Sequence, residues 1–406
     1  MVRRMDIFLA QMIALLGVAM IVAILARRLR LPYTVGLVVA GLGLAAARLE
    51  TGANLTHDLI FDLILPPLLF EAALNLDWRE LRADLAPILA LSTIGVAISA
   101  AIVAAGMVRL IGWPIPSAVI FGILIAATDP IAVIAMFKDT GVKGRLRLLV
   151  ESESLFNDGV AAVLFALALI WAQAGSNNGL AASELSRAIA TVAGGGIVLG
   201  LASGALAILV AGRTSDHLVE TALTAVAAYG SFLLAEHFHL SGVLACVSAG
   251  LVMGNLGLLR EDDQSSLSAR ARTFVVEFWE FAAFIANSLV FLLIGLRAGA
   301  IPFAGIGLTT LVIANLLVLL GRALTVYPLC LGFAGSRWRI PMARQHVLWW
   351  GGLRGALALA LALSLPESLP YRDEIVIAAF GVVTFSVIVQ GVTMPILLRW
   401  LGVAKA

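Results

Sequence analysis

Long apolar stretches recur along the whole of this 406-residue chain and restrict its fold more than any other feature. A helix needs about 20 mainly apolar residues to cross the hydrocarbon core of a bilayer. Thirteen stretches meet or approach that length: 7–26, 31–48, 57–75, 86–109, 115–137, 147–172, 186–211, 218–238, 241–257, 272–298, 302–333, 341–365 and 374–401. Charged residues make up only 13% of the chain, against about 25% in soluble domains. The sequence therefore predicts an all-α polytopic membrane protein.

Lys and Arg gather in alternate connections between these stretches, most densely in 138–147 and 337–344. Short cytoplasmic loops carry an excess of these two residue types. We therefore expect the odd-numbered loops to be cytoplasmic, with the N-terminus outside and the C-terminus inside a cell (inner) membrane.

The number of stretches predicts two six-helix repeats of opposite topology, with interrupted helices that cross near mid-membrane, as in many secondary transporters. Repeat 1 covers about 7–172 and repeat 2 about 218–401, joined by a linker helix at about 186–211. The loops are short, so we expect a single transmembrane domain over 1–406 and no soluble C-terminal domain.

A polar cluster lies at the start of the 147–172 stretch. Glu153, Ser154, Asn157 and Asp158 are spaced so that one face of a helix carries all of them. The apolar run 160–171 follows at once, which places the cluster at membrane depth. Ionisable groups at that depth are costly and usually mark an ion path or a proton relay.

A second motif, Thr128-Asp129-Pro130, lies in the middle of the 115–137 stretch. Proline removes a backbone donor and disfavours helical geometry at the residue before it. Non-helical backbone at membrane depth must line a cavity or be buried in protein. The motif therefore predicts an interrupted helix whose carbonyls, hydroxyl and carboxylate can bind a cation; the alternative is a proline kink in a packing helix.

Glu71 is a third acidic residue within an apolar stretch, although Asp77 follows closely and Glu71 is alternatively a snorkelling residue near a helix end. A small hard cation prefers several oxygen ligands. Asp158, Glu71, Ser154 and Thr128 can supply them together with a water. A carboxylate binds either the cation or a proton, and Asn157 beside Asp158 adds no second ionisable group.

Arg354 lies in a glycine-rich segment, Gly351–Gly355, inside another apolar stretch. An arginine at that depth needs a carboxylate partner, and we predict that Glu153 is this partner. The alternative is a water-exposed arginine near the membrane face. Arg322, in a further stretch, fits either an ion pair or a snorkelling side chain.

These motifs together resemble the NhaP/NHE sodium–proton exchangers of the monovalent cation–proton antiporter superfamily, over essentially all of the predicted spans. The matching segments are Thr128-Asp129-Pro130, Glu153-Ser154-Leu155-Phe156-Asn157-Asp158 and Gly351-Gly352-Leu353-Arg354-Gly355.

The resemblance implies that Asp158 binds the cation or proton, helped by Ser154, Thr128, Glu71 and a water-linked Asp129. It implies that Glu153, Asn157 and Arg354 form a structural network at the site, and that the Asn-Asp pair marks electroneutral exchange. It also implies a homodimer in contact with membrane lipids and an elevator-like movement of a six-helix core.

From these features we expect a secondary active antiporter that exchanges Na⁺, or Li⁺, for H⁺. A K⁺/H⁺ antiporter is the main alternative, because the sequence does not separate ions that differ mainly in radius, and a cation channel is a second. An enzyme is disfavoured, since no Ser-His-Asp or His-Glu-x-x-His arrangement occurs at a suitable depth. No cofactor and no nucleic-acid partner is expected, because the chain has no Cys/His cluster with metal-ligand spacing and no dense basic patch.

Overall fold

The computed structural model describes residues 2–29, 32–48, 55–173, 182–258 and 267–403, and all regular structure within these ranges is helical. The α-helices are α1 (Val2–Leu29), α2 (Tyr33–Ala46), α3 (Leu65–Leu74), α4 (Trp78–Ala83), α5 (Leu85–Leu89), α6 (Val96–Gly106), α7 (Ile115–Leu124), α8 (Ile131–Thr140), α9 (Arg145–Gln173), α10 (Ala182–Ala211), α11 (His217–His237), α12 (Gly242–Met253), α13 (Ala269–Ala300), α14 (Leu308–Gly332), α15 (Met342–Trp350), α16 (Ala356–Leu363), α17 (Arg372–Phe385) and α18 (Gly391–Trp400). Short π-helical segments continue several of them: η1 (Leu59–Ile64), η2 (Ala90–Gly95), η3 (Met107–Ile111), η4 (Gly254–Leu258) and η6 (Ser386–Gln390); η5 (Phe303–Gly305) is a 3₁₀ turn.

Within the described ranges, seven continuous helices are long and apolar enough to cross a membrane: 85–111, 145–173, 183–211, 217–237, 270–300, 308–332 and 372–400. Shorter apolar helices cover 12–26, 33–46, 115–124 and 242–258. The predicted all-α membrane fold is therefore confirmed, and every predicted span falls on a helical segment. The number of membrane crossings and the boundaries of the two repeats stay predictions.

Two of the predicted spans are interrupted in the middle. The first is helical up to Leu124, non-helical over 125–130 and helical again from Ile131. The second ends its first helix at Trp350 and starts the next at Ala356, with five residues, 351–355, between them. The proline of the first motif and the glycines of the second account for these breaks. Each interrupted span is the fifth of its predicted repeat, as a pair of related halves requires.

Helices from the two predicted repeats also pack against each other in a paired way. The second helix of one half, α2, packs against the third of the other, α13, and α12 packs in the same way against α3. Glycine permits the close approach of α2 and α13, because a Cβ atom on Gly41 would lie 2.2 Å from the Leu292 carbonyl oxygen and one on Gly295 would lie 2.1 Å from that of Val38.

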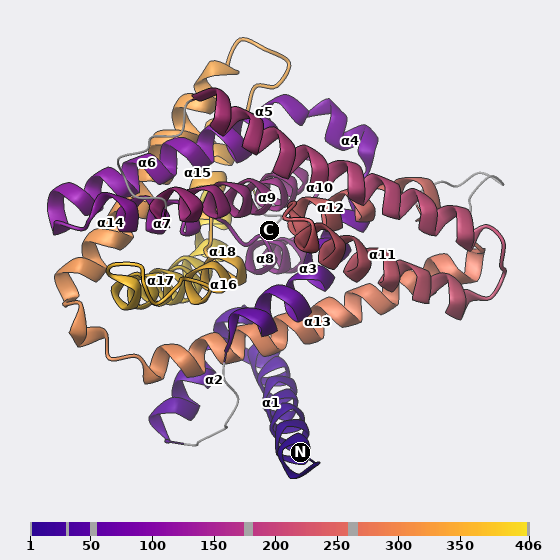
Figure 1. Cartoon of the computed structure of the whole chain (residues 1–406), viewed down its shortest axis with the longest axis horizontal. Helices are drawn as coiled ribbons and strands as arrows, with labels where there is room; N and C mark the ends of the chain where they lie inside the picture. The colour runs from indigo at the N-terminus through magenta and orange to yellow at the C-terminus, as the bar shows by residue number, and fades with distance from the viewer. Residues whose placement is uncertain (1, 30–31, 49–54, 174–181, 259–266, 404–406) are drawn as a thin grey trace.

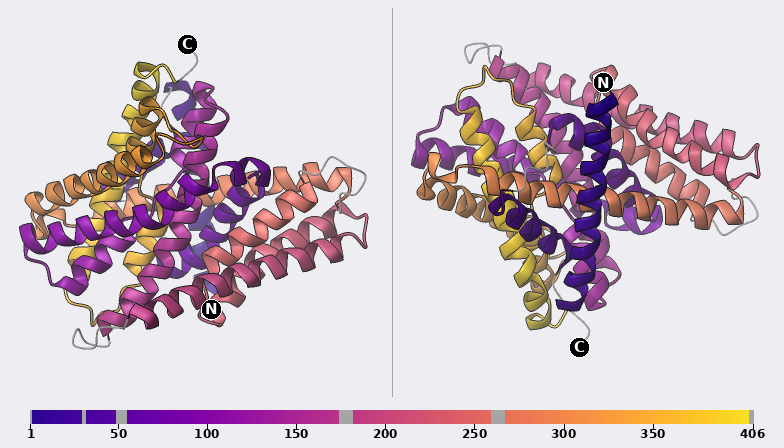
Figure 2. Two further views of the ribbon diagram at one scale, coloured as in Figure 1. Left: turned by 90° about the horizontal axis from the view of Figure 1, so that it is seen from above. Right: turned by 90° about the horizontal axis from the view of Figure 1, so that it is seen from below.

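Figure 1 shows α10, α11 and α12 grouped on one side of the molecule and α6, α14 and α17 on the other, with α8 and α9 between the groups. The long helix α13 runs across both groups along one face. The views from above and below show α10 and α11 side by side, extending away from the interrupted helices (Figure 2). Helix α8, which follows the first interruption, therefore lies between the two groups.

Candidate ion-binding site

The two interrupted spans meet at Asp129. Its backbone N–H donates to the Leu353 carbonyl oxygen across 2.7 Å, so the two non-helical segments are joined directly. Its Oδ1 accepts from the backbone N–H of Ile131 at 2.8 Å and so holds the first turn of α8. A Cβ atom on Gly355 would lie 2.2 Å from Asp129 Oδ2, so only glycine fits where α16 begins beside this carboxylate.

Arg354 binds the carbonyl end of the first interruption. Its Nη1 donates to the carbonyl oxygens of Ala126 and Ala127 at 2.5 and 3.2 Å. Its backbone N–H donates to the Ser386 hydroxyl at 3.0 Å. The guanidinium is 2% exposed and therefore places a buried positive charge on carbonyl groups that the broken helix leaves without helical partners.

The predicted ion pair between Arg354 and Glu153 is wrong, because Glu153 pairs with Arg322 instead. Nη1 and Nη2 of Arg322 donate to Oε1 and Oε2 of Glu153, both at 2.8 Å. Arg322 reaches Glu153 from α14, whereas the side chain of Arg354 binds carbonyl oxygens of the non-helical segment that follows α7. This bidentate geometry is the strong form of an arginine–carboxylate pair.

Asn157 connects α9 to the interrupted helix. Its Nδ2 donates to the carbonyl oxygen of Ala126 at 3.2 Å and to the hydroxyl of Thr128 at 3.1 Å, with a longer contact of 3.4 Å to Glu153 Oε1. The Thr128 hydroxyl in turn donates to Ser154 Oγ at 3.0 Å. The side chains of Glu153, Asn157 and Thr128 are therefore fixed relative to one another within the buried interior.

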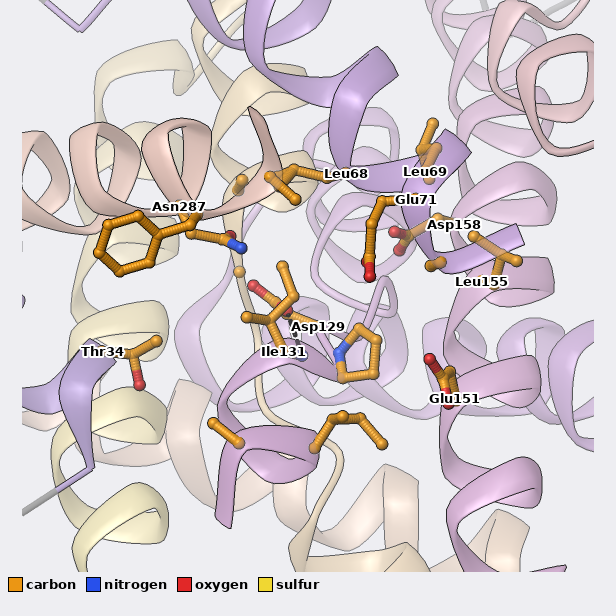
Figure 3. A pocket seen from close by; sticks show the side chains of 18 of the residues that line it. Thr34, Leu68, Leu69, Glu71, Asp129, Ile131, Glu151, Leu155, Asp158 and Asn287 are labelled. Carbon is orange, nitrogen blue, oxygen red and sulfur yellow. Dashed lines mark hydrogen bonds between the residues drawn. The ribbon is translucent and has the colours of Figure 1, made fainter. Parts of the chain in front are cut away.

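Asp158 follows Asn157 on α9, and its side chain faces a cavity. It is 9% exposed, and its Oδ1 has no hydrogen-bond partner in the part of the chain that the structure describes. Together with Thr128, Asp129 and Glu71 it lines a cavity of about 590 Å³, here called the central cavity. Figure 3 shows the carboxylates of Asp158 and Glu71 directed into this cavity from α9 and α3.

Ser154 is not among the residues that line the central cavity. Its hydroxyl lies behind Thr128, from which it accepts a hydrogen bond. Of the five candidate ligands predicted from the sequence, the structure places four on the wall of the central cavity: Asp158, Thr128, Glu71 and Asp129. In its described conformation Ser154 holds the Thr128 hydroxyl and does not face the cavity.

Glu71 occupies the boundary between two cavities. It lines the central cavity and an adjoining cavity of about 510 Å³, whose wall also includes Glu151, Lys138 and Arg147. Asn75 Nδ2 donates to Glu71 Oε1 at 2.9 Å and so restrains the carboxylate. The position on a cavity wall favours an ion-handling residue over the alternative of a snorkelling side chain.

Sequence reasoning missed Asn287 of α13, which lines the central cavity, and left the role of Arg322 open. The adjacent pair Asn287-Ser288 interrupts a long apolar run and is a signal that was available. Sequence reasoning also did not include Glu151 among the candidate site residues. Glu151 is ion-paired to Arg147 at 3.3 Å but lines both cavities.

Two interrupted helices that cross inside an all-helical membrane fold, beside a buried carboxylate on a cavity, define a secondary ion transporter. Comparison with known proteins identifies the family. The family described as the transmembrane sodium/hydrogen exchanger matches residues 15–400, and the chain belongs to it. It is therefore a transporter and not an enzyme.

Relatives of known name match over nearly the whole chain. The Na⁺/H⁺ antiporter ApNhaP of Aphanothece halophytica is 41% identical over 97% of this chain and 74% of its own length. The Na⁺/H⁺ antiporter NhaH of Halobacillus dabanensis is 36% identical over 98% of both chains. A solved structure of the sodium proton antiporter MjNhaP1 from Methanocaldococcus jannaschii shares the fold, with a TM-score of 0.75 and 22% identity over 98% of this chain and 99% of the other.

Proposed function

We propose that this protein exchanges Na⁺ for H⁺ across the membrane and that the two ions compete for the carboxylate of Asp158. The observation that carries the proposal is the state of this carboxylate, which is buried on a cavity wall with one oxygen free of any partner in the described chain. A carboxylate in that position binds a cation or a proton, because leaving it charged and unpaired is costly. The names of the relatives favour Na⁺ over the K⁺ alternative.

The surrounding residues divide into ligands and supports. Asp158, Thr128 and Glu71 supply oxygens to Na⁺ from the cavity wall, and Asp129 contributes through a water. Ser154 holds the Thr128 hydroxyl or, after a small rotation, binds Na⁺ itself. No cofactor is needed in this cycle.

Glu153, Asn157 and Arg354 keep the crossing of the broken helices in shape. Asn157 and Arg354 both donate to the Ala126 carbonyl oxygen, and Glu153 Oε1 accepts a hydrogen bond from Asn157 Nδ2. Arg322 completes this network, because it pairs with Glu153 and neutralises its charge.

Exchange at a single carboxylate is electroneutral. Asp158 carries one Na⁺ in one direction and one H⁺ in the other, so each half of the cycle moves the same charge. Glu153 stays paired with Arg322 and does not add a second exchanging proton.

The central cavity communicates with residues of the loop predicted to be cytoplasmic, Lys138 and Arg147, which also line its wall. We infer that this conformation is open to the cytoplasm, with the N-terminus outside. Movement of the helices that carry Asp158, relative to α2 and α13, would expose the site to the other side.

We further propose a homodimer in an inner membrane, surrounded by lipids.

Proton flux into sealed proteoliposomes, followed with a pH-sensitive dye, tests the proposal. Na⁺ and Li⁺ added to the wild-type protein are expected to evoke flux, K⁺ much less, and Asp158→Asn none, with the variant eluting as folded protein on size exclusion. A response to K⁺ alone would change the substrate and keep the mechanism. Flux retained in Asp158→Asn would remove Asp158 from it, and single-channel currents would contradict an antiporter.

A further inference from the structure

Helix α13 brings one amide side chain, Asn287, to the wall of the central cavity opposite α9, which carries Asp158. Figure 3 shows its amide directed into the cavity from α13, across from Glu71 and Asp158. The side chain is 9% exposed, and no residue of the described chain donates to its Oδ1.

The neighbouring polar groups of α13 are in a different state. The Ser288 hydroxyl donates to the Phe284 carbonyl oxygen and is hydrogen-bonded to the Tyr33 hydroxyl of α2. Tyr33 also stacks on Phe284, with ring centroids 5.5 Å apart. These contacts fix α2 to α13. Of the adjacent residues Asn287 and Ser288, it is therefore Asn287 whose polar group can face a ligand.

A buried amide oxygen without a partner lowers stability, so its retention on a cavity wall points to a ligand that satisfies it. Asn carbonyl oxygens are good ligands for hard cations. The amide is also neutral, and so it adds an oxygen dipole without adding a group that binds the exchanged proton. Because nothing in the described structure holds Oδ1, rotation about the last side-chain bond can exchange Oδ1 and Nδ2 and present the oxygen to the cavity.

We propose that Asn287 supplies an oxygen to the coordination shell of the monovalent cation held by Asp158 and thereby sets cation affinity and the preference for Na⁺ over Li⁺. This inference rests on the proposed exchange at Asp158. Asn287 sits on α13 and Asp158 on α9, so the contact is made only while these helices face each other across the central cavity. Proton binding by Asp158 does not use the amide.

The test is a pair of substitutions that each replace an asparagine by an apolar residue of similar size. Asn287→Leu removes the proposed ligand. Asn315→Leu is the matched control, since Asn315 lies on α14, also has an unpartnered Oδ1 among the described residues, and is not among the residues lining the central cavity. Apparent KM values for Na⁺ and Li⁺ and the maximal rate are measured by dye-reported proton flux in proteoliposomes.

We expect Asn287→Leu to raise the KM for Na⁺ roughly tenfold, as loss of one contact to a charged group implies. The maximal rate should stay within about twofold and the ratio of the KM values for Na⁺ and Li⁺ should change. Asn315→Leu should leave all three quantities unchanged. Asn287→Ala removes the amide without adding bulk and should give the same rise in KM if the leucine variant does not fold.

An unchanged KM in a folded Asn287 variant would overturn the inference, as would an equal change in Asn315→Leu. These outcomes are distinct from failure of the proposed function. If the proposed function itself were wrong, the wild-type protein would show no Na⁺-evoked flux, or Asp158→Asn would retain it.

Discussion

Asp158 differs from the other acidic residues around the interrupted helices in what its oxygens contact. Both oxygens of Glu153 are bound by Arg322. One oxygen of Asp129 holds the start of α8, and the other is buried without a hydrogen-bond partner among the described residues. Asp158 also has an unpartnered oxygen, within the described chain, on the wall of the same cavity. Glu153 and Asp129 thus brace other parts of the structure, and Asp158 is the carboxylate that we propose exchanges ions.

The buried pair of Glu153 and Arg322 gives the first prediction. Arg322→Met leaves the Glu153 charge buried and unpaired and should lower the free energy of unfolding by about 3–5 kcal/mol. The double variant Arg322→Met/Glu153→Leu should recover most of that loss, because it removes both charges. Thermal unfolding in detergent measures the effect.

Lys138 provides the control for this prediction. Its ion pair with Glu280 is 3.5 Å long, and the two side chains are 56% and 65% exposed. Lys138→Met should therefore cost less than about 1 kcal/mol. A loss of similar size in Lys138→Met and Arg322→Met would show that burial of the Glu153 pair is not what makes it important.

At the scale of the helices, the contact between α2 and α13 matters most for the shape of the cavity, since these two helices form the wall that faces Asp158. Gly295→Ala would place a Cβ atom 2.1 Å from the Val38 carbonyl oxygen. Because backbone cannot move aside cheaply, we expect a loss of about 1–3 kcal/mol and a lower transition temperature.

Gly43→Ala is the matched control on the same helix pair, because a Cβ atom there would meet nothing within 4 Å. Its effect should be neutral or a gain of up to about 1 kcal/mol from helix propensity. Equal destabilisation by the two alanines would mean that α2 and α13 do not pack as closely as described here.

The helices and the first interruption were predictable because hydropathy and proline act locally. Apolar length located the spans, and Pro130 located the break before α8. The glycines around Arg354 indicated close packing, but they did not specify that 351–355 would be non-helical or that Leu353 would accept a hydrogen bond from Asp129. That contact joins segments more than 200 residues apart, and no local pattern encodes it.

The side-chain network was predictable in membership but not in pairing. Glu153, Asn157 and Arg354 do lie together at the site. Either Arg322 or Arg354 could pair with Glu153, and the sequence does not determine which of the two does. Asn287 was missed because a single neutral side chain in a 32-residue helix carries little weight against its apolar surroundings.

At the scale of the whole molecule, the two interrupted helices meet at their non-helical segments, where Arg354 and Asp129 compensate the partial charges of the helix ends. If Asp158 exchanges the ions as proposed, the transported charge is that of Asp158 and its ligand alone. We predict that a membrane potential imposed on proteoliposomes with K⁺ and valinomycin will leave the initial rate of Na⁺-evoked proton flux unchanged. A rate that changes severalfold with potential would contradict one-for-one exchange.

Competition of Na⁺ and H⁺ for Asp158 is the central claim, and proton release on Na⁺ binding tests it most directly. Purified protein is titrated with NaCl by calorimetry in buffers of different ionisation enthalpy, at a pH where Asp158 is largely protonated, with choline chloride as the control salt. We predict that close to one proton is released for each Na⁺ bound and that Asp158→Asn releases none. Na⁺ binding without proton release, or release that persists in Asp158→Asn, would contradict the account.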